Sequence, residues 1–275
     1  EAVVGSRAWG LAGEGSDTDE RGVFALPLPW TLGLADPPRD LVSADGSATF
    51  WEVGKAVRQG LRADPNTLEL LFVPTARALD PIGEWLLAER DAFVSAEIYG
   101  TFGRYALSQL TKLSRAQRLA AHRAAIIEWL RAEEPPSLDE VAKRLAKIAP
   151  RPGARDEDAL LTAKEYVKQL YRSLFDQGRL PGADWGSLIR YAREGGDLDL
   201  GVARELRPKN AYNLLRLLSV ATEWLRTGSV DLVVRGPLRD RLLAIKHGEV
   251  PLDDVLAEAE AMTADLEAAR RETKL

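Results

Sequence analysis

Two aspartates and a glycine–serine pair near the start of the chain have the residue types of a metal and phosphate site. Asp17 and Asp19 are two residues apart, so on a strand both carboxylates would point to the same side. Their oxygens would suit a hard divalent cation, Mg²⁺ or Mn²⁺. Gly5 would let the backbone approach a phosphate closely, and Ser6 offers a hydroxyl and an amide. The residues that follow could begin a helix whose amide end faces the anion.

Together these residues predict a cradle for a nucleoside triphosphate. Metal ions would bridge the phosphates and activate an attacking hydroxyl while pyrophosphate leaves in line. The predicted reaction is transfer of a nucleoside monophosphate from the triphosphate to an acceptor hydroxyl. Asp17 and Asp19 would be the catalytic metal ligands, and Gly5 and Ser6 would hold the phosphates. The protein itself would mainly position the reactants.

The elements that must position these residues follow from apolar patterning and turn residues. Short apolar runs between Gly, Ser and Asp turns predict strands early in the chain. Thr49 and Glu52 have capping-box spacing, which predicts a helix running to about Ala63, followed by a short helix at Thr67–Phe72. The strands are expected at Ala2–Val4, Gly22–Leu26 and Leu41–Val42.

From Pro81 onward the periodicity is helical almost throughout, with one short strand expected at Val230–Val234. The predicted fold is therefore α+β, with a small mixed β-sheet forming a nucleotidyltransferase palm over residues 1–75. A larger helical C-terminal portion, residues 76–275, would close over the cleft. Because the chain opens at Glu1 as though a strand had been entered midway, we also expect the N-terminus to be incomplete.

The motif resembles the nucleotidyltransferase signature of the DNA polymerase β superfamily: a strand, Gly-Ser, a helical turn, then Asp-x-Asp on the next strand. Gly5–Gly10 and Ser16–Val23 look like the bacterial and phage nucleotidyltransferase family associated with RNA repair. Asp64–Leu71 resembles that family's Asn-Pro-Asn-x-Leu-Glu-x-Leu segment. Further resemblance lies at Tyr99–Lys112, Lys209–Leu218 and Ile245–Glu249.

The resemblance implies a nucleoside triphosphate as substrate and an RNA acceptor, such as a tRNA end. Many enzymes of this kind carry a third carboxylate that completes the metal site, just before the helix expected at residues 49–63. Ser47 stands at that point in this chain. Asp45, two residues earlier, or Glu52, on the expected helix, could supply the missing oxygen. A chain that lacks the third acid could bind nucleotide or RNA without catalysing transfer, and a protein or small-molecule acceptor stays open.

Several basic and polar residues are further candidates for nucleotide binding. Arg7 follows the Gly-Ser pair and could reach a phosphate, or instead be solvated or paired with Glu14 or Glu20. Ser16 belongs to the same motif. Lys209 and Arg216 share one helix face with Asn213, which could hold the triphosphate or simply be a solvated polar face. A local RNA-binding patch would combine Lys209, Arg216, Lys164 and Lys168.

Asn66, Glu69 and Trp9 lie in the segments that resemble the family, and each has a structural or a functional interpretation. Asn66 and Glu69 lie at the start of a short helix, where Asn caps well and Glu suits the helix dipole. We therefore expect structural roles for both. Trp9, inside the motif, could form a wall of the nucleotide pocket.

The composition bounds the remaining possibilities. The chain has 37 basic and 42 acidic residues among 275, so no overall basic field indicates nucleic-acid binding. It contains no cysteine, which excludes disulfides and thiolate metal sites, and only two histidines. No apolar run approaches the roughly twenty residues of a membrane helix. The sequence thus predicts a cytoplasmic protein without a membrane partner, and it indicates neither base preference nor oligomeric state.

Overall fold

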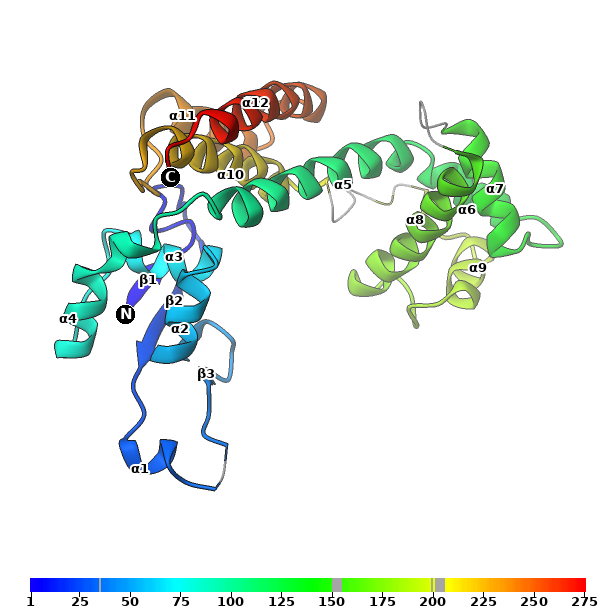
Figure 1. The fold of residues 1–275 in the computed structure, drawn as a ribbon. Helices are drawn as coiled ribbons and strands as arrows, with labels where there is room; N and C mark the ends of the chain where they lie inside the picture. The colour runs from blue at the N-terminus through cyan, green and yellow to red at the C-terminus, as the bar shows by residue number, and fades with distance from the viewer. Residues whose placement is uncertain (35, 150–154, 199, 201–205) are drawn as a thin grey trace. The chain divides into compact units, whose positions relative to one another are not determined.

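A computed structural model describes the chain from residue 1 to 275 except residues 35, 150–154, 199 and 201–205 (Figure 1). Its contacts divide the chain into two compact units, one formed by residues 1–110 and 211–275 and the other by residues 111–210. The palm and helical parts expected from sequence, residues 1–75 and 76–275, stay a prediction. By contacts, the C-terminal helices belong to the same compact unit as the sheet.

The first unit contains a four-stranded mixed sheet, as the sequence predicted. The strand order is β1-β2-β4-β3, with β2 and β4 parallel and the two outer pairs antiparallel. The helices α2 and α3 pack against the strands, α2 on β2 and β4 and α3 on β1 and β2 (Figure 1). The bounds are Ala2–Val4 for β1, Asp19–Phe24 for β2, Asp40–Val42 for β3, Ala48–Glu52 for β4, Val53–Gly60 for α2 and Pro65–Phe72 for α3.

The largest departure from the sequence-based fold lies at residues 48–52. The expected capping box at Thr49 and Glu52 is wrong, because these residues form strand β4 instead of a helix start. Glu52 is itself the N-cap residue of α2, and its carboxylate accepts hydrogen bonds from the amides of Gly54 and Lys55. Thr49 and Trp51 are β-branched and aromatic, which suits a strand that pairs on both sides.

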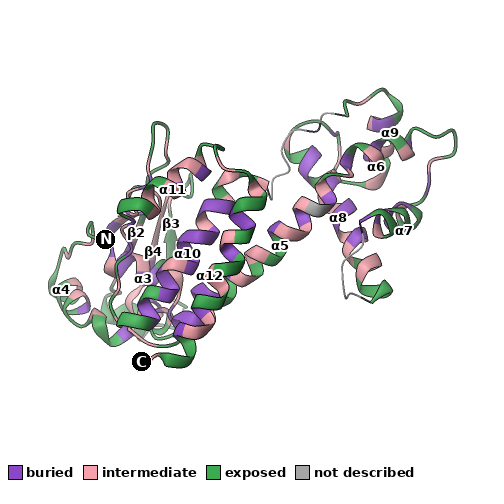
Figure 2. Cartoon of the chain, turned by 90° about the horizontal axis from the view of Figure 1, so that it is seen from above, coloured by how far each residue is buried: buried purple, intermediate pink, exposed green. Residues whose placement is uncertain are grey.

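The first unit contains further helices, of which α5 continues past Leu110 into the second unit and α10 enters the first unit at Ala211. Helix α10 has buried residues along much of its length (Figure 2). Trp224 on α10 meets the ring of Phe72 on α3 edge-on, with centroids 5.8 Å apart. The segment Val230–Val234 is not a strand, contrary to the sequence-based expectation. The bounds are Leu28–Thr31 for α1, Pro81–Ala88 for α4, Arg90–Phe93 for η1, Tyr99–Gly103 for η2, Arg104–Ala120 for α5, Pro208–Thr227 for α10, Gly236–Lys246 for α11 and Leu252–Glu272 for α12.

The second unit is helical and has its own apolar core. Helices α7 and α8 pack closely on each other, and α9 contacts α6 and α8. Buried side chains from all four helices, among them Ile126, Leu145 and Leu170, form one cluster. The bounds are Arg123–Leu130 for α6, Leu138–Ile148 for α7, Asp156–Asp176 for α8 and Trp185–Arg193 for α9.

Candidate functional site

The glycine–serine motif forms a tight turn directly after β1, spanning Gly5 to Leu11. The amide of Trp9 donates to the carbonyl of Gly5 at 3.1 Å, and the amide of Leu11 donates to that of Ser6 at 2.9 Å. Gly5 and Gly10 both have positive φ, 74° and 77°, which favours glycine at each position. The helix expected to start here does not form. We call residues 5–11 the phosphate turn.

The amides of the phosphate turn divide into occupied and available groups. The amide of Gly5 donates to Oε1 of Glu69 at 2.8 Å, so it is not available to a phosphate. No described residue accepts a hydrogen bond from the amides of Ser6, Arg7 or Ala8. Consecutive free amides in a tight turn form a concave donor surface that suits an anion.

Asp19 lies against the phosphate turn, because β1 and β2 pair with Val4 opposite Asp19. A Cβ atom at Gly5 would make a tight contact, 3.3 Å, with Oδ2 of Asp19, and the positive φ also favours glycine there. Asp19 is the first residue of β2, whereas Asp17 precedes the strand and is exposed. Strand alternation therefore applies to Asp19 alone, and the placement of Asp17 is set by the loop.

Arg7 holds the loop that carries Asp17. Its Nε donates to the carbonyl of Asp17 at 3.3 Å, and its Nη2 donates to the carbonyl of Ser16 at 2.7 Å. The hydroxyl of Ser16 accepts a hydrogen bond from the amide of Gly13 at 2.9 Å. Neither Glu14 nor Glu20 forms an ion pair with Arg7 in the part of the chain that the structure describes. Arg7 and Ser16 thus both shape the aspartate loop.

Both candidates for a third metal ligand are engaged elsewhere. Oδ1 of Asp45 accepts hydrogen bonds from the hydroxyl of Ser43 and from the amide and hydroxyl of Ser47. These bonds, the one from the Ser43 hydroxyl first, lower the pKa of Asp45 to about 2. Glu52 caps α2 through both of its carboxylate oxygens. Each carboxylate therefore stabilises a local backbone feature.

Ser47 itself lies beside the start of β2. Its carbonyl accepts a hydrogen bond from the amide of Glu20 at 2.9 Å, in the parallel pairing of β2 with β4. Ser47 thus immediately precedes β4 and is bonded to the residue that follows Asp19. Among the described residues, no group of three or more His, Asp or Glu side chains could hold a metal ion. The Asp19 carboxylate lies beside the phosphate turn, and Asp17 is held near it through its backbone carbonyl, which accepts from Arg7.

Glu69 connects the phosphate turn to α3, a role that the sequence did not reveal. The sequence-based reading gave it a structural role at the start of a helix, but α3 is capped by Asp64, whose carboxylate accepts from the amide of Thr67. Burial raises the pKa of Glu69, and the charge of Arg216, the Gly5 amide and the Trp9 indole oppose that rise. Glu69 is therefore a nearly buried acid whose hydrogen bond fixes the first residue of the turn.

Arg216 reaches the same turn from α10. Its guanidinium lies over the ring of Trp9, 3.5 Å from the centroid, and donates twice to Oδ1 of Asn213. Only 5% of Arg216 is exposed, so the solvated polar face considered from sequence is excluded for this residue. Burial lowers the pKa of Arg216 to about 10, while Glu69 and Tyr212 act in the opposite direction. One face of Trp9 is thus covered by protein.

The remaining members of the expected basic patch, Lys209, Lys164 and Lys168, belong to the second compact unit. Lys209 is exposed, and Arg216 belongs to the first unit. Lys164 pairs with Asp139 at 2.5 Å, and Lys168 pairs with Glu165 at 2.7 Å. The charges of these two lysines are therefore offset within the second unit.

Two cations from α11 also contact the phosphate turn. Nε of Arg239 donates to the carbonyl of Gly10 at 2.8 Å, and Nζ of Lys246 donates to the carbonyl of Leu11 at 2.7 Å. The amide of Val234 donates to the carbonyl of Trp9 at 2.9 Å. Sequence reasoning assigned no role to Arg239 or Lys246, although Lys246 lies within the stretch Ile245–Glu249 that was part of the family resemblance.

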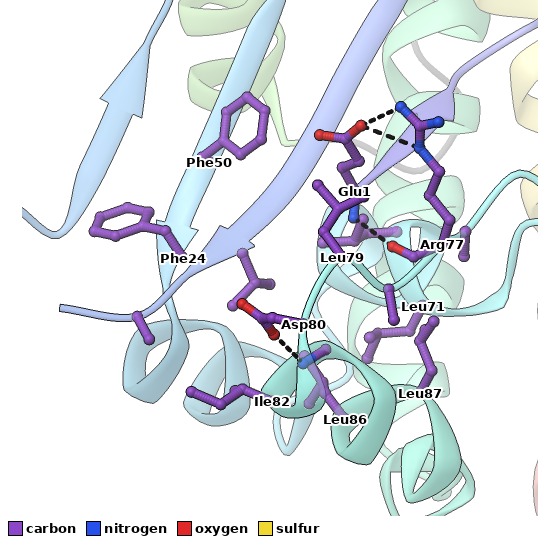
Figure 3. A pocket seen from close by; sticks show the side chains of 16 residues that line it. Glu1, Phe24, Phe50, Leu71, Arg77, Leu79, Asp80, Ile82, Leu86 and Leu87 are labelled. Atoms are coloured by element: carbon purple, nitrogen blue, oxygen red, sulfur yellow. Dashed lines mark hydrogen bonds and ion pairs between the residues drawn. The ribbon is translucent and has the colours of Figure 1, made fainter. Parts of the chain in front are cut away.

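A separate cavity of about 280 Å³ lies near the opposite end of β2 from Asp19 (Figure 3). Its lining is mostly apolar and includes Phe24, Phe50 and Leu86. Its polar groups are engaged, because Arg77 pairs with Glu1 and Asp80 caps α4 through the amide of Gly83. The cavity lining includes none of the candidate metal and nucleotide ligands, which are Gly5, Ser6, Arg7, Ser16, Asp17, Asp19, Lys209 and Arg216.

Comparison with known proteins gives one match. The model of the family RlaP, described as the RNA repair pathway DNA polymerase beta family, matches residues 1–168. No curated protein and no solved structure matches the chain. The matched segment includes the phosphate turn, both aspartates and Glu69, and it ends before α10 and α11 begin. None of the helices in the described parts of the chain is long and apolar enough to span a membrane.

Proposed function

Because the chain belongs to the RNA repair pathway DNA polymerase beta family, we propose that it is a metal-dependent nucleotidyltransferase acting on RNA. In the proposed reaction an oxygen of the acceptor hydroxyl forms a bond to the α-phosphorus of a nucleoside triphosphate. The bond from that phosphorus to the bridging oxygen breaks, pyrophosphate leaves, and the hydroxyl proton is released to solvent. Family membership supports a nucleotidyltransferase-like role, and the finer statement is our proposal.

The observation that carries the proposal is the contact between the phosphate turn and Asp19. Free amides at Ser6, Arg7 and Ala8 lie in the turn whose first residue, Gly5, is packed against the Asp19 carboxylate. A phosphate bound by these amides would lie close to the Asp19 carboxylate, and the two negative charges would repel each other. The arrangement therefore suits a phosphate that is bound together with a cation. A triphosphate with a divalent metal supplies both.

The donor set fits Mg²⁺ or Mn²⁺ held jointly by protein and substrate. Mg²⁺ in triphosphate sites is bound through one or two carboxylates, substrate phosphates and retained waters, so two aspartates suffice as protein ligands. Asp17 and Asp19 would hold the ion, which would neutralise charge on the phosphates. Arg7 and Ser16 would act on the metal site indirectly, by fixing the loop that carries Asp17.

An RNA end is the acceptor we propose, on the strength of the family's association with RNA repair. The described residues of the expected basic patch give it little support, since Lys164 and Lys168 are paired and Arg216 is buried. The acceptor is therefore the part of the proposal that an experiment must address first.

A second candidate function is a noncatalytic nucleotide- or RNA-binding module. It is favoured by one observation: Asp45 and Glu52 accept hydrogen bonds from local groups, and Ser47 stands where the family resemblance implies a third carboxylate. A protein of this kind would keep the phosphate turn and both aspartates and bind a triphosphate without releasing pyrophosphate.

The test is incubation with each α-phosphate-labelled nucleoside triphosphate, Mg²⁺ or Mn²⁺, and total RNA, followed by gel analysis. We expect a labelled RNA band that disappears in the Asp17→Asn, Asp19→Asn double variant, because neutral side chains hold the ion far less tightly. Glu20→Gln is the matched control: it removes an acid from the same strand, on the face opposite Asp19, and labelling should persist. Label on the protein itself would instead point to a protein acceptor.

The two candidate functions are separated by Ser47→Asp. If the chain is a binder that lacks only the third acid, the wild type should bind nucleotide without labelling RNA, and Ser47→Asp should gain labelling. If the wild type labels RNA, the binder is excluded. Pyrophosphate release measured in parallel reports transfer to any acceptor, including small molecules.

A further inference from the structure

Helix α11 presents two cations to one end of the phosphate turn. Arg239 and Lys246 are about two helical turns apart, which places them on the same face of the helix. Their side chains reach the carbonyls of Gly10 and Leu11, adjacent residues at the end of the turn. Asp19 lies at its other end, against Gly5. The phosphate turn therefore has a carboxylate beside its first residue, Gly5, and two cations beside its last two residues, Gly10 and Leu11.

These two cations keep most of their hydrogen-bonding capacity. A lysine ammonium has three donors and a guanidinium has five, and one donor of each is used on a turn carbonyl. Within the described residues Lys246 forms no ion pair, and Arg239 only approaches the exposed carboxylate of Asp240 at 4.0 Å. By contrast Arg241, on the same helix, pairs with Glu258 at 2.9 Å.

Two positive charges lie at the phosphate turn, and their one acidic contact among the described residues is Asp240, 4.0 Å from Arg239. Such a pair of cations suits an anionic ligand. Several negative charges would meet there if a triphosphate bound beside Asp17 and Asp19, and one divalent ion would offset only part of them. A phosphate oxygen makes a shorter and stronger hydrogen bond to a cation than a neutral carbonyl does. Both side chains are partly exposed, so their heads can turn from the carbonyls to a ligand.

We propose that Arg239 and Lys246 bind the terminal phosphates of the nucleoside triphosphate, the β- and γ-phosphates that leave as pyrophosphate. The α-phosphate would lie nearer Asp19, where the acceptor attacks. This inference rests on the proposed function and adds residues outside the segment that the family model matches, since that segment ends at residue 168. It also separates the two kinds of cation at the turn: Arg216 is buried against Trp9, and the α11 pair remains available.

The test measures the affinity of ATP, ADP and AMP, each with Mg²⁺, by titration calorimetry. For Lys246→Met and Arg239→Met we expect ATP affinity to fall roughly tenfold to a hundredfold, as for the loss of a charge-assisted hydrogen bond, and AMP affinity to stay unchanged. Lys246→Arg should retain most of the affinity for ATP. Arg241→Met removes a paired cation from the same helix and should bind all three nucleotides normally.

The dependence on phosphate number separates ligand binding from a purely structural role. Equal losses for ATP and AMP, or unchanged ATP affinity in both methionine variants, would overturn the assignment of Arg239 and Lys246 and leave the proposed function standing. A wild-type chain that binds none of the three nucleotides overturns the proposed function itself, and this inference with it.

Discussion

The phosphate turn is held from two sides by charged residues of opposite character. On one side Glu69 is partly buried and Arg216 is buried against Trp9, and the charge of each favours the ionised form of the other. On the other side Arg239 and Lys246 are partly exposed and donate to backbone carbonyls. We call Glu69, Arg216 and Trp9 the closed brace, and we call Arg239 and Lys246 the open brace.

The difference shows how one turn can be held in place by some residues and still bind a ligand through others. A buried charge is costly unless it is compensated, so removing one member of the closed brace should destabilise the fold. A hydrogen bond from a partly exposed cation to a backbone carbonyl contributes little net stability, because water can replace either partner. Breaking it, by a ligand or by a substitution, therefore costs little free energy. The closed brace should therefore determine stability, and the open brace should determine nucleotide affinity.

The largest expected effect comes from removing the acid of the closed brace. Glu69→Ala leaves Arg216 buried without its compensating charge and the Gly5 amide without an acceptor, so the free energy of unfolding should fall by roughly 3 kcal/mol. Urea denaturation measures the change. Glu69→Gln keeps an acceptor for the amide and should lose less. If Glu69→Ala cost no more than an exposed substitution such as Asn66→Ala, the closed brace would not be a stabilising unit.

Arg216→Lys should have the next largest effect. Lysine keeps the charge but lacks the planar group that stacks on Trp9 and donates twice to Asn213, so we expect a loss of roughly 2 kcal/mol. The measurement is again denaturation, with Trp9→Leu combined in a double-mutant cycle. Additive effects of the two substitutions would show that the stacking contact contributes nothing.

Substitutions in the open brace should be nearly silent in the same assay. Arg239→Met and Lys246→Met each remove one hydrogen bond to a carbonyl that water can reach, so the unfolding free energy should fall by less than about 1 kcal/mol. Their nucleotide affinity, in contrast, should drop. A stability loss as large as that of Glu69→Ala would contradict the division into a closed and an open brace.

The smallest effect expected is a pH dependence that belongs to Glu69. Burial raises its pKa in the folded state, so the folded chain binds its proton more tightly than the unfolded chain does. The corresponding stability is complete below about pH 4.5 and is lost as pH rises through the higher folded-state pKa. The difference in unfolding free energy between wild type and Glu69→Gln should therefore move against the wild type as pH rises from 4 to 7. Parallel curves would mean that Glu69 is not shifted.

Local patterns in the sequence predicted much of the local structure. The strand at Ala2–Val4 is confirmed, the one expected at Gly22–Leu26 begins earlier, at Asp19, and the short helix expected at Thr67–Phe72 is α3, Pro65–Phe72. The helix start expected at Thr49 is wrong, because capping-box spacing also occurs in a strand, and sheet pairing with β2 and β3 decides between them. The mixed-sheet α+β fold and the family are confirmed.

The sequence by itself determined the motif: which residues could bind a metal and a triphosphate, and the glycines that the turn needs. Only the tertiary structure decided what surrounds the turn. Lys246 and Leu11 are 235 residues apart in sequence, and Glu69 and Gly5 are 64 apart. Periodicity and capping signals report neighbours within a few residues, whereas these contacts depend on how helices pack on the sheet. The same packing buried Arg216 and left Arg239 and Lys246 partly exposed. All three are basic residues on helices, so the sequence alone does not show which of them is buried.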